Sequence, residues 1–380
     1  MKYVRNKSGY NSGQTPRAKK EPHNEKEIVT AFTLATDGRA LAKSKEGTLV
    51  FIDRLLPNET AQVNITTVKN SYKSASINEI KNEVPERVQA PCSYYDECGG
   101  CSLQHLKQEF HIDYKIQWLF ETLNRIGKWK SENISEIKKR LSIVYLNQWN
   151  YRRRIRLHFD GKSLGFKKNL SNNITDIKNC LITHPLINKK IKELSSLCQE
   201  GFKFLTNQNE LKKIKLELEL TVSDNNKCIV HIARLETEPK KVESISFTYY
   251  QKLFVIQHDE RLQLDHPELG RMKIKKESFV QPHMHSIESY YFHIKSSLDK
   301  FLSNLFVKKM NLKTDNKFSA LDLFCGSGVF TCIPYFLSKK YSFDFSVLGV
   351  EGIGPSVDSF KKNYEDHAVR VECEDVFSYI

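Results

Sequence analysis

The chain has 380 residues and a formal net charge of +14 at pH 7, and 39% of its residues are hydrophobic. This length provides for two or three domains with apolar cores. The basic, polar start resembles no secretory signal, and no run of about 18 apolar residues is present to span a membrane. These features predict a cytoplasmic protein. The excess of Lys and Arg favours a nucleic acid as partner over mere solubility charge or an anionic membrane surface.

The N-terminal part of the sequence predicts a basic tail followed by a small barrel. Residues 1–25 have no apolar period, which indicates a disordered tail. Residues 26–85 contain short stretches rich in β-branched residues, such as IVTAFTLAT and AQVNITTV, separated by the turn signals DG and PN. Several short strands at this spacing predict a β-barrel of the oligonucleotide-binding type.

A cysteine-rich segment follows. Cys92, Cys98 and Cys101 lie within ten residues, and Cys180 is the next cysteine along the chain. A reducing compartment disfavours disulfides, so these soft ligands indicate an iron–sulfur cluster or a zinc ion. Zinc fits less well, because structural zinc sites usually pair two CxxC knuckles and only one is present. Incidental buried thiols are the remaining alternative.

The middle of the chain is predicted to be rich in β-structure. Residues 107–128 show helical spacing of apolar residues, and the later segments YRRRIRLHFD and IKLELELTV have the pattern of strands, with a polar helix near 186–203 between them. Apolar and polar residues alternate without a miss in the second of these strands. The first strand carries four arginines that either contact nucleic-acid phosphates and bases or form a solvated face: Arg152, Arg153, Arg154 and Arg156.

The pattern changes after about residue 286. A helix is expected first, followed by the apolar strands SALDLF, FSVLGVE and VRVEC, with a helix after each of the first two. This βαβαβ order predicts a doubly wound parallel sheet.

The first of these strands leads into a glycine-containing loop, DLFCGSGVF, that opens the next helix. Gly326 and Gly328 would let the backbone approach a nucleoside closely. Glu351 ends the second strand, where its carboxylate can accept hydrogen bonds from both ribose hydroxyls. Together these features indicate an adenosine-containing cofactor, although the missing third glycine of GxGxxG disfavours a dinucleotide. A tight turn with a capping glutamate is the structural alternative.

Taken together, these segments resemble the RNA (uracil-C5)-methyltransferases that carry an N-terminal TRAM domain and an iron–sulfur cluster. The resemblance covers residues 26–380 and rests on segments that occur in the family's order: CSYYDECGGCSLQHL, YRRRIRLHFDGKSLGF, DIKNC, ESFVQPH, LDLFCGSGVF and GVEG. It is closest to the members that modify 23S ribosomal RNA. It implies S-adenosylmethionine-dependent C5-methylation of a uridine in RNA, with ribosomal RNA favoured over transfer RNA.

The resemblance also implies a multidomain fold of the α/β plus β class. An OB-like TRAM barrel would occupy residues 26–85, a central β-rich cluster-containing domain 86–285, and a partial Rossmann-like class I methyltransferase fold 286–380. A monomer is favoured. The family pattern maps a [4Fe–4S] cluster onto Cys92, Cys98, Cys101 and Cys180. It maps S-adenosylmethionine contacts onto Gln281, Phe324, Glu351 and Asp375, which join the loop glycines Gly326 and Gly328.

The sequence departs from the family in one respect that concerns activity. The family's cysteine nucleophile and carboxylate base lie downstream of the third strand, beyond Ile380. We therefore assign no catalytic residue and expect a C-terminally truncated member that does not methylate uracil as written. Cys325 and Cys373 are poor substitutes, since neither lies in a nucleophile motif of the family. Two alternatives are a non-catalytic RNA-binding remnant and a zinc-stabilised nucleic-acid-binding protein.

Overall fold

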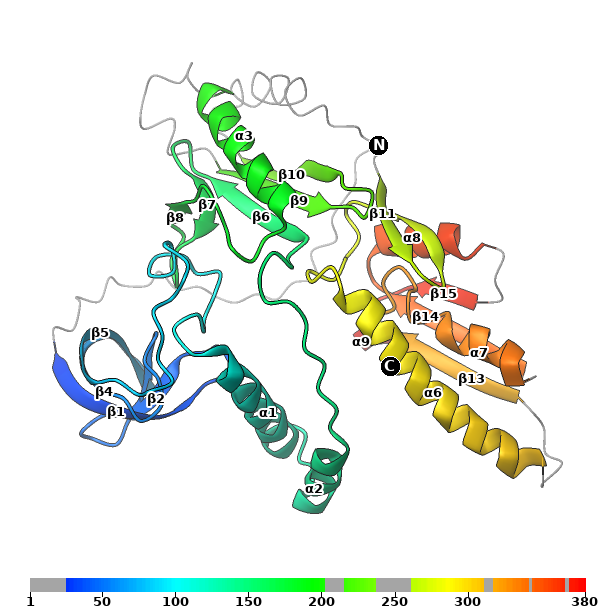
Figure 1. Ribbon diagram of the computed structural model, residues 1–380, viewed down its shortest axis with the longest axis horizontal. Helices are drawn as coiled ribbons and strands as arrows, with labels where there is room; N and C mark the ends of the chain where they lie inside the picture. The colour runs from blue at the N-terminus through cyan, green and yellow to red at the C-terminus, as the bar shows by residue number, and fades with distance from the viewer. Residues whose placement is uncertain (1–24, 202–214, 237–260, 311–316, 342–343, 366–368) are drawn as a thin grey trace. The chain divides into compact units, whose positions relative to one another are not determined.

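The computed structural model divides the chain into two compact units (Figure 1). It describes residues 25–201, 215–236, 261–310, 317–341, 344–365 and 369–380, so nearly all of the predicted tail lies outside the described residues. One unit is Met1–Pro91 with Cys101–Arg140, and the other is Cys92–Gly100 with Leu141–Ile380. No helix in the described ranges is long and apolar enough to cross a membrane.

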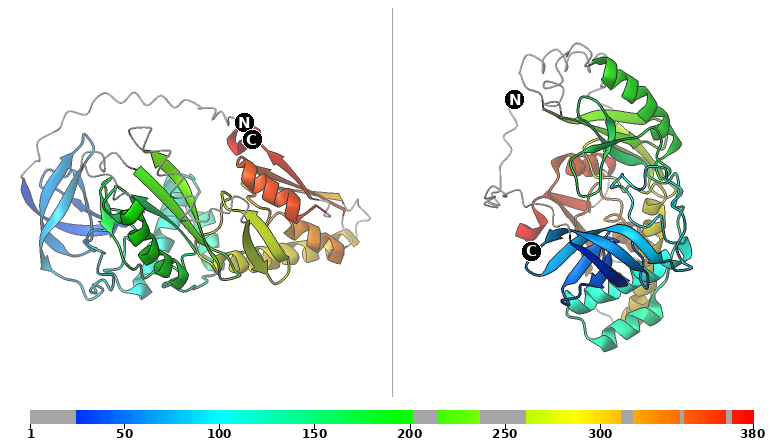
Figure 2. Two further views of the ribbon diagram at one scale, coloured as in Figure 1. Left: turned by 90° about the horizontal axis from the view of Figure 1, so that it is seen from above. Right: turned by 90° about the vertical axis from the view of Figure 1, so that its left-hand side faces the viewer.

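The first unit contains a closed barrel whose strands follow the order β1-β2-β3-β5-β4. They are β1 (Lys26–Leu34), β2 (Ala40–Lys43), β3 (Leu49–Ile52), β4 (Thr60–Val68) and β5 (Tyr72–Asn82). The blue strands of Figure 2 form this ring, with β1 pairing with both β2 and β4. The predicted barrel is therefore confirmed. Strand β5 (YKSASINEIKN) escapes sequence-based detection because polar residues dominate it.

Two helices, α1 (Gln108–Arg125) and α2 (Ser131–Arg140), complete the first unit. Helix α1 packs on the barrel through Phe110, Tyr114 and Trp118, and the Trp118 indole donates a hydrogen bond to the Leu34 carbonyl at 2.9 Å. The helix predicted at 107–128 is confirmed, whereas α2 was not predicted.

A buried ion pair links the barrel to the segment after β5. The carboxylate of Glu59 is fully buried and accepts hydrogen bonds from Arg87 Nε and Nη2, both at 2.6 Å. It also accepts one from the Leu56 amide at 2.8 Å, while Arg87 Nη2 donates to the Arg54 carbonyl at 2.8 Å. Each charge of this pair is thus compensated by the other and by backbone groups, as burial requires.

The second unit contains a central antiparallel sheet in the order β10-β9-β6-β7-β8. Its strands are β6 (Arg154–Phe159), β7 (Leu164–Lys167), β8 (Ile174–Asp176), β9 (Lys215–Val222) and β10 (Cys228–Glu236). Helix α3 (Pro185–Gly201) packs on β7, β9 and β10. The predicted alternation is confirmed in β9, which buries every second residue: Leu216, Leu218, Leu220 and Val222.

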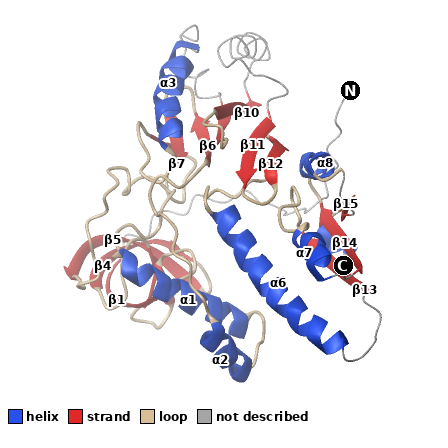
Figure 3. Cartoon of the chain, turned by 45° about the vertical axis from the view of Figure 1, so that its right-hand side comes forward, coloured by secondary structure: helices blue, strands red, loops and turns tan. Residues whose placement is uncertain are grey.

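A hairpin leads from this sheet into a three-stranded parallel sheet ordered β13-β14-β15. The elements are β11 (Arg261–His266), β12 (Gly270–Lys275), α6 (Ser286–Met310), β13 (Lys317–Leu323), α7 (Ile333–Tyr341), β14 (Asp344–Glu351), α8 (Gly354–Asn363), β15 (Val369–Cys373) and α9 (Val376–Tyr379). Helix α7 packs on β14, α8 on β14 and β15, and α6 on α7, as Figure 3 shows. The predicted βαβαβ parallel sheet is confirmed.

Candidate functional site

The loop between β13 and α7 has an unusual backbone. Phe324, Gly326 and Gly328 have φ values of +61°, +58° and +87°. A left-handed conformation is uncommon for a bulky residue such as phenylalanine, and Phe324 is 61% exposed. The loop lies at the carboxyl ends of the parallel strands, where open α/β sheets bind ligands.

Glu351, the last residue of β14, holds this loop in place. Its side chain is largely buried, with one oxygen accepting a hydrogen bond from the Gly326 amide at 3.0 Å and the other from the Ile353 amide at 2.8 Å. The amide of Cys325 donates to the Val350 carbonyl at 3.2 Å. The structure therefore brings together the glycine loop and the acidic strand end, two features that are remote in the sequence.

Gly328 meets a packing requirement as well as a conformational one. A Cβ atom at this position would lie 2.4 Å from Cδ2 of Phe360 and 2.9 Å from Cε2 of Tyr364. Both rings belong to the core cluster between the parallel sheet and its helices. At Gly326, in contrast, an added Cβ would meet nothing within 4 Å. The α7 end of the loop thus approaches α8 too closely for any side chain.

Asp322 is a residue of this site that sequence reasoning missed. Its carboxylate accepts a hydrogen bond from the Thr331 hydroxyl at 2.6 Å, which joins the two sides of the loop. Burial raises the pKa of Asp322 above the usual range of an aspartate. Its position as the acidic residue of an apolar strand just before a glycine loop was the available signal.

The other predicted cofactor residues are placed differently. Asp375 caps α9, accepting hydrogen bonds from the amide and hydroxyl of Ser378 at 3.1 and 3.2 Å. Helix α9 lies beside the loop, because the Phe377 ring packs edge-on against Phe324 with centroids 5.6 Å apart. Gln281 comes from a separate segment between β12 and α6. The roles of these residues in cofactor binding stay predictions.

The cysteine-rich segment packs on the central sheet of the second unit. The Gly99 amide donates to the Lys167 carbonyl at 3.0 Å, and the Lys178 amide donates to the Tyr94 hydroxyl at 3.2 Å. A Cβ at Gly99 would lie 3.1 Å from the Lys167 carbonyl oxygen, which is a tight contact. These contacts hold Cys92 and Cys98 in the same unit as Cys180, whose backbone amide donates to Asn188 Oδ1 at 2.8 Å.

Cys101, the remaining predicted ligand, belongs to the first unit, where it begins the segment Cys101–Arg140. Across the described residues, no group of three or more His, Cys, Asp or Glu side chains is arranged to hold a metal ion. The donor chemistry of the four thiols fits an iron–sulfur cluster. The [4Fe–4S] assignment therefore stays a prediction.

The four arginines at and just before β6 do not form an exposed basic face. Arg153 is only 1% exposed and forms an ion pair with Asp224. Arg154 donates to the carbonyls of Ser278 and Lys276 at 2.6 and 2.8 Å. Only Arg156 has a side chain as much as 52% exposed, and it pairs with two glutamates, Glu217 and Glu219. Phosphate contact by Arg153 is thus excluded by its burial.

The chain has sequence relatives over most of its length, although no family model matches it. It is 27% identical to the 23S rRNA (uracil(1939)-C(5))-methyltransferase RlmD of Shewanella halifaxensis over 358 residues, which are 91% of this chain and 75% of that protein. The identically named enzyme of Histophilus somni is 27% identical over 382 residues, covering 94% and 77%. The chain is a relative of the RNA (uracil-C5)-methyltransferases. The resemblance inferred from the sequence motifs is thereby confirmed.

A solved methyltransferase structure shares the fold. The tRNA (uracil-54, C5)-methyltransferase of Pyrococcus abyssi, in complex with S-adenosyl-L-homocysteine, is similar with a TM-score of 0.55 and 17% sequence identity. The similarity covers 91% of this chain and 79% of that one. At this identity the likeness concerns the fold alone, and the chain as a whole has a fold similar to that of this methyltransferase.

Proposed function

We propose that this protein binds S-adenosylmethionine and serves the C5-methylation of a uridine in RNA, with 23S ribosomal RNA as the substrate. The observation that carries the proposal is the contact of Glu351 with the left-handed glycine loop at the carboxyl ends of the parallel strands. In a relative of uracil methyltransferases, this arrangement suits the adenosine part of the methyl donor.

The Glu351 carboxylate retains hydrogen-bonding capacity for a ligand. Each of its oxygens accepts one backbone hydrogen bond, and a carboxylate offers about four acceptor positions in total. The remaining positions suit the two ribose hydroxyls. The exposed Phe324 ring, backed by Phe377, offers an apolar surface beside them. S-adenosylmethionine bound there would supply the electrophilic methyl group.

No catalytic nucleophile is proposed among these residues. In the family's reaction a cysteine thiolate adds to C6 of uracil, C5 then accepts the methyl group, and a base removes the C5 proton. Burial, together with the Asp322 and Glu351 carboxylates, raises the pKa of the Cys325 thiol to about 12, so this group is not a thiolate at neutral pH. Cys373 lies exposed at the end of β15. Neither cysteine is assigned as the nucleophile.

We further propose that the barrel is a TRAM-type module that binds RNA, ahead of a central cluster-containing domain and the methyltransferase domain. Its closed five-stranded topology is one that oligonucleotide-binding folds share, and the net charge of +14 favours phosphate contacts. Binding of a 23S ribosomal RNA fragment should therefore weaken steeply as the salt concentration rises. Affinity that is independent of salt would contradict this part of the proposal.

Calorimetry with S-adenosyl-L-homocysteine tests the methyl-donor site. We expect the unaltered protein to bind it and Glu351→Gln to bind it about tenfold or more weakly, because charge-assisted hydrogen bonds contribute about 1.5–3 kcal/mol. The Gln amide group would also face the Gly326 or Ile353 amide, donor against donor. Glu374→Gln, at an exposed neighbouring carboxylate, is the matched control and should bind normally. The proposal fails if the unaltered protein does not bind or if Glu351→Gln binds equally well.

We also propose that Cys92, Cys98, Cys101 and Cys180 hold a [4Fe–4S] cluster. The support is the family pattern, together with the contacts that attach the CGGC segment to the sheet beside Cys180. The cluster would stabilise this part of the second unit, since metal-site binding energy contributes to folding.

Iron and sulfide analysis of anaerobically purified protein tests the cluster. We expect about four of each per chain, and we expect Cys98→Ser to lose both together with the brown colour. Cys373→Ser changes an exposed cysteine outside the set and should retain full iron content. Stoichiometric zinc without sulfide would contradict the proposal.

A further inference from the structure

The segment that carries Gln281 is hydrogen-bonded to the residues just before β6 and at its start. We call residues 276–285, between β12 and α6, the Gln281 linker. The Arg153 amide donates to the Pro282 carbonyl at 2.8 Å, and the Met284 amide donates to the Tyr151 carbonyl at 3.1 Å. Arg152 and His283 form an antiparallel bridge between these bonds. The linker therefore runs antiparallel to the chain that enters β6, with Gln281 at the end of the paired stretch.

Arg154 holds the other half of the linker. Its Nη1 donates to the Ser278 carbonyl at 2.6 Å and its Nη2 to the Lys276 carbonyl at 2.8 Å. Its Nε donates to the Thr221 hydroxyl on β9 at 2.8 Å. A guanidinium has its donors in a rigid planar fork, so these three bonds together define both the position and the orientation of the linker backbone.

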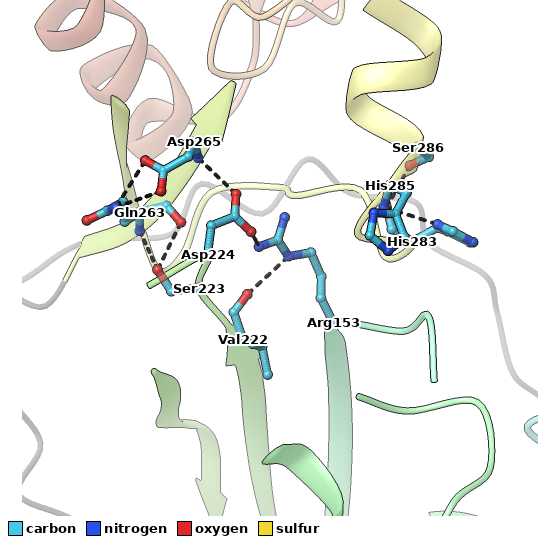
Figure 4. Close-up of polar contacts among 9 residues, drawn as sticks. All are labelled: Arg153, Val222, Ser223, Asp224, Gln263, Asp265, His283, His285 and Ser286. Carbon is cyan, nitrogen blue, oxygen red and sulfur yellow. Dashed lines mark hydrogen bonds and ion pairs between the residues drawn. The ribbon is translucent and has the colours of Figure 1, made fainter. Parts of the chain in front are cut away.

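Arg153 anchors the strand from which these bonds come. Figure 4 shows its guanidinium between the Val222 carbonyl, to which Nε donates at 3.0 Å, and the carboxylate of Asp224. The second oxygen of Asp224 accepts a hydrogen bond from the Asp265 amide on β11 at 2.8 Å. Arg153, directly before β6, thus joins the end of β9 and, through Asp224, the β11–β12 hairpin that is continuous with the linker.

The linker is rigid just after Gln281 and is attached to α8 on its other side. Pro282 restricts its own φ, and the His283 ring stacks on Tyr151 with centroids 4.7 Å apart. The Ser278 hydroxyl lies 3.3 Å from the Ser359 hydroxyl, which also accepts a hydrogen bond from the Lys275 amide at 3.0 Å. Ser359 lies on α8, the helix that begins three residues after Glu351.

We propose that Arg153 and Arg154 are positioning residues of the methyl-donor site, which fix the linker so that the Gln281 carboxamide is held ready for S-adenosylmethionine. The inference rests on the proposed function, because it takes Gln281 as a contact of the methyl donor. It assigns these arginines a role other than RNA contact. Holding a ligand-binding side chain in place beforehand raises affinity because less conformational entropy is lost on binding.

Calorimetry of an Arg154→Lys variant tests the inference. A single ammonium group cannot keep the bonds to both carbonyls, so we expect affinity for S-adenosyl-L-homocysteine to fall about fivefold to tenfold. RNA affinity should stay within about twofold, because the positive charge remains. Arg156→Lys is the matched control, on the same strand but largely exposed, and it should change neither affinity.

A double-mutant cycle separates positioning from general structural support. If Arg154 acts through Gln281, then Gln281→Ala alone and Gln281→Ala with Arg154→Lys should bind S-adenosyl-L-homocysteine equally weakly. Independent roles would give multiplied losses instead. Multiplied losses would overturn the inference.

The possible outcomes distinguish this inference from the proposed function. An unaltered protein that does not bind S-adenosyl-L-homocysteine refutes the proposed function itself. Normal ligand binding by Arg154→Lys, with weakened RNA binding, refutes the inference alone and makes the arginine an RNA contact. If Arg154→Lys fails to fold, Ser359→Ala replaces it. This small change removes the Ser359 hydroxyl contacts with Ser278 and Lys275 without altering charge, and about threefold weaker ligand binding is expected.

Discussion

A Gly328→Ala variant should lose detectable binding of S-adenosyl-L-homocysteine and should also be less stable. Its Cβ would lie 2.4 Å from a ring carbon of the buried Phe360, and the backbone has φ of +87°. Overpacking a core costs about 1–3 kcal/mol, and a left-handed backbone costs a residue with a Cβ about 1–2 kcal/mol more. Relief of the clash requires the loop to move away from α8, which displaces the Gly326 amide from Glu351.

Gly326→Ala is the control for this prediction. Its φ of +58° is also left-handed, yet an added Cβ has no neighbour within 4 Å. Its free energy of unfolding, measured with urea, should therefore fall only by what the left-handed backbone costs a residue with a Cβ, about 1–2 kcal/mol. Equal effects of the two substitutions, or normal ligand binding by Gly328→Ala, would show that the contact with Phe360 does not shape the loop.

Replacing Glu59 by leucine should destabilise the barrel by about 3–5 kcal/mol, a large part of the stability of a typical domain. The substitution leaves the Arg87 guanidinium, whose side chain is 15% exposed, without its carboxylate partner. It also removes the acceptor of the Leu56 amide. Fluorescence-detected unfolding measures the effect, since the indole of Trp118 is hydrogen-bonded to the barrel strand β1. RNA affinity should fall at temperatures where the barrel unfolds.

Two further variants separate the buried pair from surface charge. Glu59→Leu combined with Arg87→Met removes both charges and should recover much of the lost stability, because no buried charge then lacks a partner. Glu79→Leu breaks an exposed pair with Lys81 on β5 and should change stability by less than about 1 kcal/mol. A double variant as unstable as Glu59→Leu would show that the stability is lost through a cavity or a missing backbone contact, and not through the unpaired charge of Arg87.

Local patterns in the sequence were enough to predict several of the elements, the loop after β13 and the family. Alternation in IKLELELTV identified β9, and helical spacing identified α1, because each pattern reports which face of one element is buried. The strand–loop–helix signal around Gly326 and Gly328 likewise identified the loop, and the motif order identified the family. Strand β5 and helix α2 escaped detection because neither carries a sustained apolar period.

Only the tertiary structure decided what the charged residues do. Four neighbouring arginines look alike in YRRRIR, yet Arg153 is buried against Asp224, Arg154 holds the Gln281 linker, and Arg156 is mostly exposed. Asp375 likewise caps α9, and Glu59 lies inside the barrel with Arg87. The physical reason is that a charge tolerates burial only beside a compensating partner, and these partners come from distant parts of the chain that folding alone brings together.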